Sequence, residues 1–129
     1  MSEANDTVLV VDDDSAVRTA LKELFETEGY DVAVAANGRA ALNHLKVGMR
    51  PCVVLLDLMM PVMDGWDFRT EQLKDPALKE IPVFILTAAG FSDATIRAQF
   101  GNVPFVPKPP PHEELLAMVR RICSAHSRT

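Results

Sequence analysis

Five polar side chains follow apolar runs of the sequence, and their types could do chemistry together. They are Asp12 and Asp13 after "VLVV", Asp57 after "VVLL", Thr87 after "VFIL" and Lys108 after "FVP". Converging carboxylates repel one another, so one of them stays protonated or the group shares a cation. Mg2+ is the hard cation that prefers such oxygen ligands, and a lysine adds a compact positive charge. The set predicts phosphoryl transfer, in which an aspartate can itself be the nucleophile and form an acyl phosphate.

Each of these residues, taken alone, has a simpler structural explanation. Asp14 or Ser15 is expected to be the N-cap of a helix, and the acids before it could merely be solvated. Asp57 alone is more often an ordinary strand end, and Lys108 alone a solvated cation. Their shared position after apolar runs is what favours a common site.

The elements that must position these side chains alternate along the chain. Short apolar runs predict strands at 7–11, 31–35, 52–56, 82–86 and 103–106. Amphipathic stretches predict helices at 15–27, from 38 to a stop at Gly48, at 65–73, after Ser92 to 100 and from 111 onward. This order predicts an α/β fold, a doubly wound five-stranded parallel sheet flanked by five helices. Ligands of such sheets bind at the carboxyl ends of the strands, where the five polar residues are expected.

Bulk properties narrow the class of protein. The chain has 129 residues, 48% of them hydrophobic, which suits one domain with a sizeable core. A net charge of −5 argues against direct binding of nucleic acid. No apolar run approaches the roughly 20 residues of a membrane span, and the polar start does not resemble a signal peptide. We therefore expect a cytoplasmic protein in which Cys52 and Cys123 are buried and reduced.

Four motifs in this order resemble the receiver domain of bacterial two-component response regulators. They are "VLVVDDD", "LLDLMMPVMDG", "ILTA" and "FVPKP", and the resemblance extends from Thr7 to about Ala125. It implies the flavodoxin-like, CheY-like receiver fold. It also implies a receiver domain at 7–125, with tails at 1–6 and 126–129.

The resemblance implies a role for each residue of the acidic group. Asp57 would accept a phosphoryl group from a histidine kinase or a histidine phosphotransfer protein. Asp12 and Asp13 would bind Mg2+ together with Asp57, and Mn2+ could replace it. The backbone carbonyl of Met59 would complete the protein ligands of the metal. Lys108 would pair with the phosphoryl oxygens.

The resemblance also implies a switch. Thr87 would hydrogen-bond the phosphoryl group, and Phe105 matches the aromatic residue whose rotamer follows it. The Lys108–Pro109 bond matches one that is commonly cis, which would help aim the lysine. Met59 and Ala89 occupy positions that influence loss of the phosphoryl group, and neither side chain can orient water. Met59 could also shield the acceptor, so we expect slow autodephosphorylation.

The expected partners are a kinase or phosphotransfer protein, and a downstream effector or attached output domain. Activation could also produce a homodimer, whereas no direct contact with nucleic acid or membrane is expected. The chain would not be an enzyme beyond self-catalysed phosphotransfer and slow autodephosphorylation. Both a stand-alone receiver and a domain of a larger regulator or hybrid kinase are compatible with the sequence.

Other functions stay open at this point. A degenerate receiver would bind partners without phosphorylation, although all the expected site residues are present. A phosphatase with an aspartyl-phosphate intermediate would often carry a second acid where this chain has Met59. A flavin mononucleotide module would need a hydroxyl-rich phosphate loop, whereas residues 12–14 are all acidic.

Overall fold

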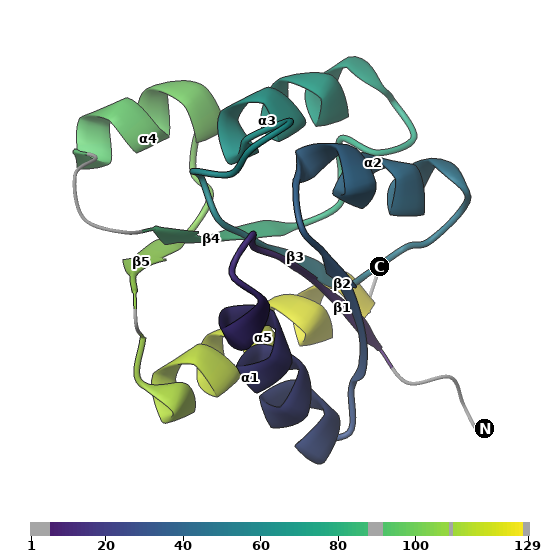
Figure 1. Ribbon diagram of the computed structural model, residues 1–129, viewed down its shortest axis with the longest axis vertical. Coiled ribbons are helices and arrows are strands. Elements are labelled where there is room, and N and C mark those ends of the chain that lie inside the picture. Colours follow the sequence, from purple (N-terminus) through teal and green to yellow (C-terminus); the bar gives the residue numbers. More distant parts are fainter. Residues whose placement is uncertain (1–5, 88–91, 109, 128–129) are drawn as a thin grey trace.

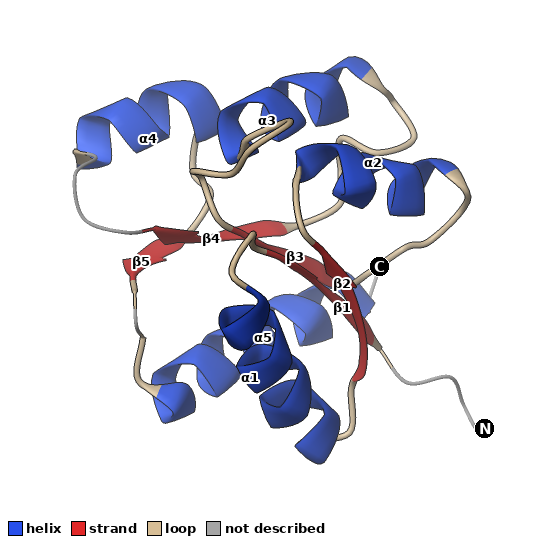
Figure 2. Ribbon diagram, in the orientation of Figure 1, coloured by secondary structure: helices blue, strands red, loops and turns tan. Residues whose placement is uncertain are grey.

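Five parallel strands form the centre of the structure in the spatial order β2-β1-β3-β4-β5 (Figures 1 and 2). The computed structural model describes residues 6–87, 92–108 and 110–127. The strands are β1 (Thr7–Val11), β2 (Asp31–Ala35), β3 (Val53–Leu56), β4 (Val83–Thr87) and β5 (Phe105–Pro107). The helices are α1 (Ser15–Thr27), α2 (Gly38–Lys46), α3 (Gly65–Lys74), α4 (Asp93–Phe100) and α5 (His112–Ser127). The predicted doubly wound α/β fold is confirmed.

Helices cover both faces of the sheet, α1 and α5 on one and α2, α3 and α4 on the other (Figure 1). Successive strand residues point to opposite faces, so each strand feeds two hydrophobic cores. In β3, Val54 and Leu56 lie in the core beneath α2, α3 and α4, and Val53 and Leu55 in the core beneath α1 and α5. This double burial explains why the strands read as continuous apolar runs.

Four helices begin at a side chain that caps their first backbone N–H groups. Asp14 caps α1 by accepting hydrogen bonds from the backbone N–H groups of Ala16 and Val17. Asn37, Asp64 and Ser92 cap α2, α3 and α4 in the same way. The predicted starts of α1 and α4 are therefore confirmed, and Asp64 serves the turn into α3 rather than the acidic site.

Two element boundaries differ from the prediction by two residues, whereas bounds of β3, β4, α3 and the start of α5 differ by one residue. The strand β5 begins at Phe105 rather than at residue 103, because Pro104 has no N–H to donate to the ladder. The helix α5 continues through Ser127, two residues into the segment predicted as a tail.

The large apolar side chains of the amphipathic stretch 65–73 do not all face the core. Phe68 is buried and Trp66 packs against Phe100, with 5.2 Å between the ring centroids, but Leu73 is 46% exposed. The neighbouring Gln72 is fully buried instead, and its Nε2 donates to the carbonyl groups of Leu78 and Ile81, both at 3.0 Å. These carbonyls belong to the loop before β4, so a polar side chain faces inward to satisfy buried backbone groups.

The two cysteines are buried as predicted, but they are not reduced. Cys52 and Cys123 form a disulfide, with their Cα atoms 4.9 Å apart. The residue before β3 lies against the last turns of α5, although 71 positions separate the two cysteines in sequence. The burial expected for each cysteine could not identify its partner, because the two sulfurs meet only when α5 packs against the sheet.

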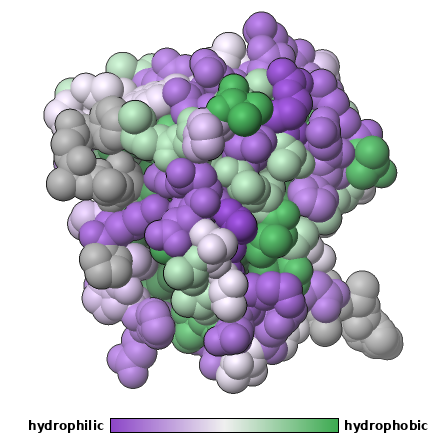
Figure 3. All heavy atoms as spheres, in the orientation of Figure 1, coloured by the Kyte–Doolittle hydropathy of each residue, from purple (hydrophilic) through white to green (hydrophobic). Residues whose placement is uncertain are grey.

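The surface is mostly polar on the face seen in Figure 3, where hydrophobic side chains form small separate groups. Large exposed hydrophobic residues of the described segments are Val47, Met59, Val62 and Leu73. Among the described helices, none is long and apolar enough to cross a membrane.

Candidate functional site

Two buried acids stand side by side because their strands are neighbours in register. Val11 of β1 pairs with Leu56 of β3, and Asp12 and Asp57 directly follow these two strands. The backbone N–H of Asp57 donates to the carbonyl of Val11 at 3.0 Å, which extends the ladder to the acid itself. Asp12 is 2% exposed and Asp57 7% exposed, whereas Asp13 is exposed to solvent. The sheet therefore places two carboxylates together with little water around them.

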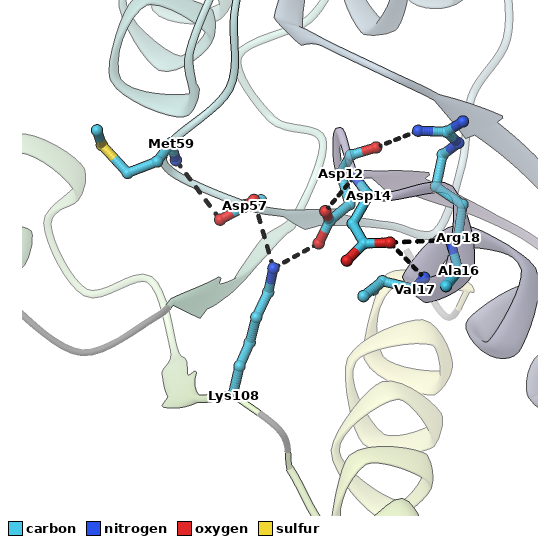
Figure 4. A network of polar contacts seen from close by, with 8 residues as sticks. All are labelled: Asp12, Asp14, Ala16, Val17, Arg18, Asp57, Met59 and Lys108. Carbon is cyan, nitrogen blue, oxygen red and sulfur yellow. Dashed lines mark hydrogen bonds and ion pairs between the residues drawn. The ribbon is translucent and has the colours of Figure 1, made fainter.

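Lys108 lies between these two carboxylates (Figure 4). Its Nζ is 2.5 Å from Asp12 Oδ2 and 3.3 Å from Asp57 Oδ2. The lysine directly follows β5, which is two strands away from β3 in the sheet. One ammonium thus faces two buried carboxylates, and the group as a whole keeps an excess of negative charge.

The carboxylate of Asp12 is held on both of its oxygens. Oδ1 accepts the backbone N–H of Asp14 at 2.9 Å, while Oδ2 faces Lys108. The backbone carbonyl of Asp12 accepts a hydrogen bond from Nη1 of Arg18 at 2.8 Å, an anchor that the sequence did not indicate (Figure 4). The loop between β1 and α1 therefore has a defined shape at the site.

The pKa values of the site reflect this excess of buried negative charge. Burial raises the pKa of Asp57, and the charge of Asp12 raises it further, whereas Lys108 and the Met59 N–H act in the opposite direction. Burial lowers the pKa of Lys108, but its hydrogen bonds to Asp12 and Asp57 and their charges outweigh burial and leave the pKa raised. Additional positive charge would therefore relieve the repulsion between the acids.

The acidic group fits a hard divalent cation. One carboxylate oxygen from each of Asp12, Asp13 and Asp57 lies within 4.8 Å of the others. Carboxylate oxygens are ligands that Mg2+ prefers, and the exposure of Asp13 leaves room for the waters that Mg2+ keeps. The structure thus brings together the three side chains predicted from the sequence as metal ligands.

Met59 does not cover the acceptor. Its side chain is 58% exposed and points away from Asp57, while its backbone N–H lies 3.5 Å from Asp57 Oδ1 (Figure 4). Shielding of Asp57 by the Met59 side chain is therefore no reason to expect slow loss of the phosphoryl group. The other reason remains, because Met59 carries no group able to orient water.

The predicted switch residues lie around the far strands of the site. Thr87 ends β4 and pairs in register with Pro107, next to Lys108, and its side chain is outside the described part of the structure. Phe105 is half-buried, and the Arg97 guanidinium stands 5.7 Å from its ring centroid. Ala89 and Pro109, including the predicted cis bond, lie outside the described residues.

Gly65 holds the loop after the acceptor in place. Its N–H donates to the carbonyl of Leu58 at 3.0 Å. A Cβ atom at this position would collide with the carbonyl oxygen of Asp57 and with Cα of Leu58. Glycine is therefore required because the start of α3 approaches the backbone of the acceptor directly.

Val62 in the same loop has a positive φ of 70°, which is costly for a β-branched side chain. Such a conformation costs about 1–2 kcal/mol, which a glycine would not pay. The larger conformational entropy of glycine in the unfolded chain offsets part of this gain in stability. We expect Val62→Gly to increase the free energy of unfolding by about 0.5–1 kcal/mol, measured by urea denaturation.

Val47→Gly is the matched control, because Val47 is also highly exposed but has an ordinary φ of −89°. This control should lose stability rather than gain it. A loss in Val62→Gly as large as the loss in the control would show that the loop carries no strain at Val62.

Known proteins share both the sequence pattern and the fold. The family model described as "Response regulator receiver domain" matches residues 8–120. A curated relative, the response regulator MprA of Mycolicibacterium vanbaalenii, is 40% identical over 116 residues, which cover 89% of this chain and 49% of the relative. The chain thus spans about half the length of this relative.

Solved structures are similar over nearly the whole chain. The signal receiver domain of a signal transduction histidine kinase from Syntrophus aciditrophicus has a TM-score of 0.85 and 30% identity, covering 96% of this chain and 94% of that one. A CheY-like response regulator receiver domain protein from Methanospirillum hungatei has a TM-score of 0.84 and 32% identity, covering 96% and 98%.

Proposed function

Because the chain belongs to the response regulator receiver domain family of two-component signalling, we propose that its Asp57 accepts a phosphoryl group from a phosphohistidine. The donor would be a histidine kinase or a histidine phosphotransfer protein. The observation that supports this role is the position of Asp57, buried at the tip of β3 beside Asp12 and 3.3 Å from the Lys108 ammonium.

The residues of the site suit an in-line transfer. A carboxylate oxygen of Asp57 would attack phosphorus as the bond to the histidine nitrogen breaks, and an acyl phosphate would form. Lys108 would neutralise the transferring oxygens, since its ammonium already lies 3.3 Å from Asp57. Asp12, Asp13, Asp57 and the backbone carbonyl of Met59 would hold Mg2+, or Mn2+ in its place. The bound ion would stabilise charge on the phosphoryl group.

Phosphorylation would act as a charge switch. It replaces the carboxylate charge of Asp57 with a phosphoryl group that carries about −1.5 to −2 charges, so Lys108 and Thr87 would be drawn toward the new oxygens. Phe105 would follow Thr87 and alter the surface of α4, β5 and α5. We propose that this surface contacts an effector or an attached output domain in the cytoplasm, or a second copy after activation.

The domain would make no direct contact with nucleic acid or membrane. Its chemistry would be limited to self-catalysed phosphotransfer and slow autodephosphorylation.

The test is the intact mass of the protein after incubation with acetyl phosphate and Mg2+, with a chelator control. We expect a gain of one phosphoryl group that the chelator prevents. Folded protein that gains no phosphoryl group at saturating Mg2+ would instead support the degenerate receiver, which binds partners without phosphorylation.

Replacement of Met59 by a polar side chain should shorten the life of the acyl phosphate. We expect Met59→Asn to hasten its decay about fivefold, because one hydrogen bond that orients water contributes about 1 kcal/mol to the barrier. The decay is followed by intact mass after removal of the phosphodonor. The isosteric control Met59→Leu should leave the rate unchanged, and equal rates in all three proteins would contradict the role of this position.

A further inference from the structure

The Cys52–Cys123 disulfide lies far from the acidic site, yet it joins the acceptor strand to the last helix. Cys52 immediately precedes β3, and Asp57 immediately follows it. Cys123 lies in the last turns of α5, the helix that begins four residues after Lys108. The bond therefore ties the far end of the acceptor strand β3 to the last turns of the helix that follows Lys108.

We propose that Cys52 and Cys123 are a site of reversible thiol oxidation that controls how firmly α5 is held on the sheet. This inference goes beyond phosphoryl transfer and does not depend on it.

The packing around the sulfurs explains why the bond would affect α5 in particular. Cys123 continues the buried stripe of Leu115 and Val119 at intervals of four residues, and all three face one core with Cys52. The cysteines are the covalent part of a contact that is otherwise hydrophobic. On the outer side of α5, Arg120 forms an ion pair with Glu28 at 3.2 Å. The side chains of Arg120 and Glu28 are 60% and 36% exposed. Such an exposed pair contributes little, so the disulfide is the strong link at this end of the helix.

The surroundings of the pair favour slow, controlled exchange. A carboxylate oxygen of Asp6 lies within 4.8 Å of both sulfurs, and this negative charge disfavours a thiolate at either cysteine. Both residues are almost fully buried, so an external thiol reaches them only when the end of α5 opens. Disulfides in the cytoplasm, the location proposed above, are usually transient or redox-sensing.

A dithiol supplies the electrons and protons that reduce the disulfide. A thiolate of the dithiol attacks one cysteine sulfur, the Cys52–Cys123 bond breaks, and a mixed disulfide forms. The second thiol of the dithiol then releases the chain and becomes part of a cyclic disulfide. The two cysteines gain two electrons and two protons and become thiols. A disulfide donor reverses these steps and joins α5 to the sheet again.

The experiment compares the oxidised and the dithiol-treated full chain under native conditions. Alkylation followed by intact mass should count no free thiols before treatment and two after it. Hydrogen exchange should become roughly tenfold faster at the α5 amides near Cys123, and this increase should exceed any increase in α2 and α3. The thermal midpoint should fall by roughly 10 °C, because the bond closes a long loop. Oxidised glutathione should restore all three values.

A Cys52→Ala/Cys123→Ala variant should behave like the reduced chain whether or not the dithiol is present. Two free thiols in the protein before dithiol treatment would overturn the proposal. So would a bond that yields only when the whole domain unfolds, because that is a permanent structural link. Equal exchange of α5 in both forms would also overturn it. None of these measurements requires phosphorylation, so their failure is distinct from failure of the proposed function.

Discussion

The Asp57→Asn variant should fail to gain a phosphoryl group and yet unfold at a higher denaturant concentration than the parent chain. The amide is not a nucleophile for phosphorus, so incorporation from acetyl phosphate should fall by roughly 100-fold or more. The same change removes a buried charge next to Asp12. Stability should therefore rise by on the order of 1 kcal/mol at neutral pH. Intact mass and urea denaturation measure the two effects.

The pH dependence of this gain follows from the raised pKa of Asp57. Burial, together with the charge of Asp12, raises its pKa above the ordinary value of 3.8, so the folded chain binds this proton more tightly than the unfolded chain. The penalty for ionised Asp57 is complete above the raised pKa and disappears below the ordinary one. The advantage of Asp57→Asn should therefore be present at neutral pH and shrink as the pH falls through this window.

Asp67→Asn is the control for a lost carboxylate, because Asp67 is exposed on α3. It should retain full phosphoryl incorporation and show no comparable gain in stability. If Asp57→Asn still gained a phosphoryl group, the acceptor would be another residue. If its stability relative to the parent chain did not change as the pH falls, the raised pKa of Asp57 would be refuted.

The Lys108→Ala variant should lose both stability and phosphoryl acceptance. Its ammonium contacts Asp12 and Asp57, and its removal leaves two buried carboxylates facing each other. Breaking a buried pair costs about 3–5 kcal/mol, and solvent screening at the partly exposed lysine favours the lower end of this range. Phosphoryl incorporation should slow at least about tenfold, since the transferring oxygens lose their cation. Lys74→Ala, which breaks an exposed pair with Glu71, should change stability by less than about 0.5 kcal/mol.

A double variant separates the charge effect from a general loss of packing. If Lys108→Ala acts by exposing the repulsion between the acids, adding Asp57→Asn should recover on the order of 1 kcal/mol more than it adds to the parent chain. Strictly additive changes would contradict this coupling. The parent chain should also lose stability at alkaline pH. The raised pKa of Lys108 means that its contribution is complete below the ordinary lysine value of 10.5 and is lost above the raised one.

The sequence by itself determined the order of elements and the place of the polar residues within them. Burial of both faces of the sheet produces continuous apolar runs in the strands, and the apolar residues of a helix recur about every 3.6 residues. Both patterns are local, so they can be identified in the sequence. The caps Asp14 and Ser92 were predictable for the same reason, since a cap contacts N–H groups only two or three residues away. Parallel strands with helices between them also place the carboxyl ends at one edge, which brought Asp12, Asp57 and Lys108 into one predicted site.

Only the tertiary structure decided what each of these residues contacts. The pair between Lys108 and Asp12 spans 96 positions, and the bond between Cys52 and Cys123 spans 71. Neither contact can be predicted from a sequence pattern with a period of two or 3.6 residues. The burial of Gln72 likewise depends on carbonyl groups of a following loop, and not on its place in the helix. Local periodicity records which face a residue takes, whereas its partner depends on which distant segments the sheet brings to that face.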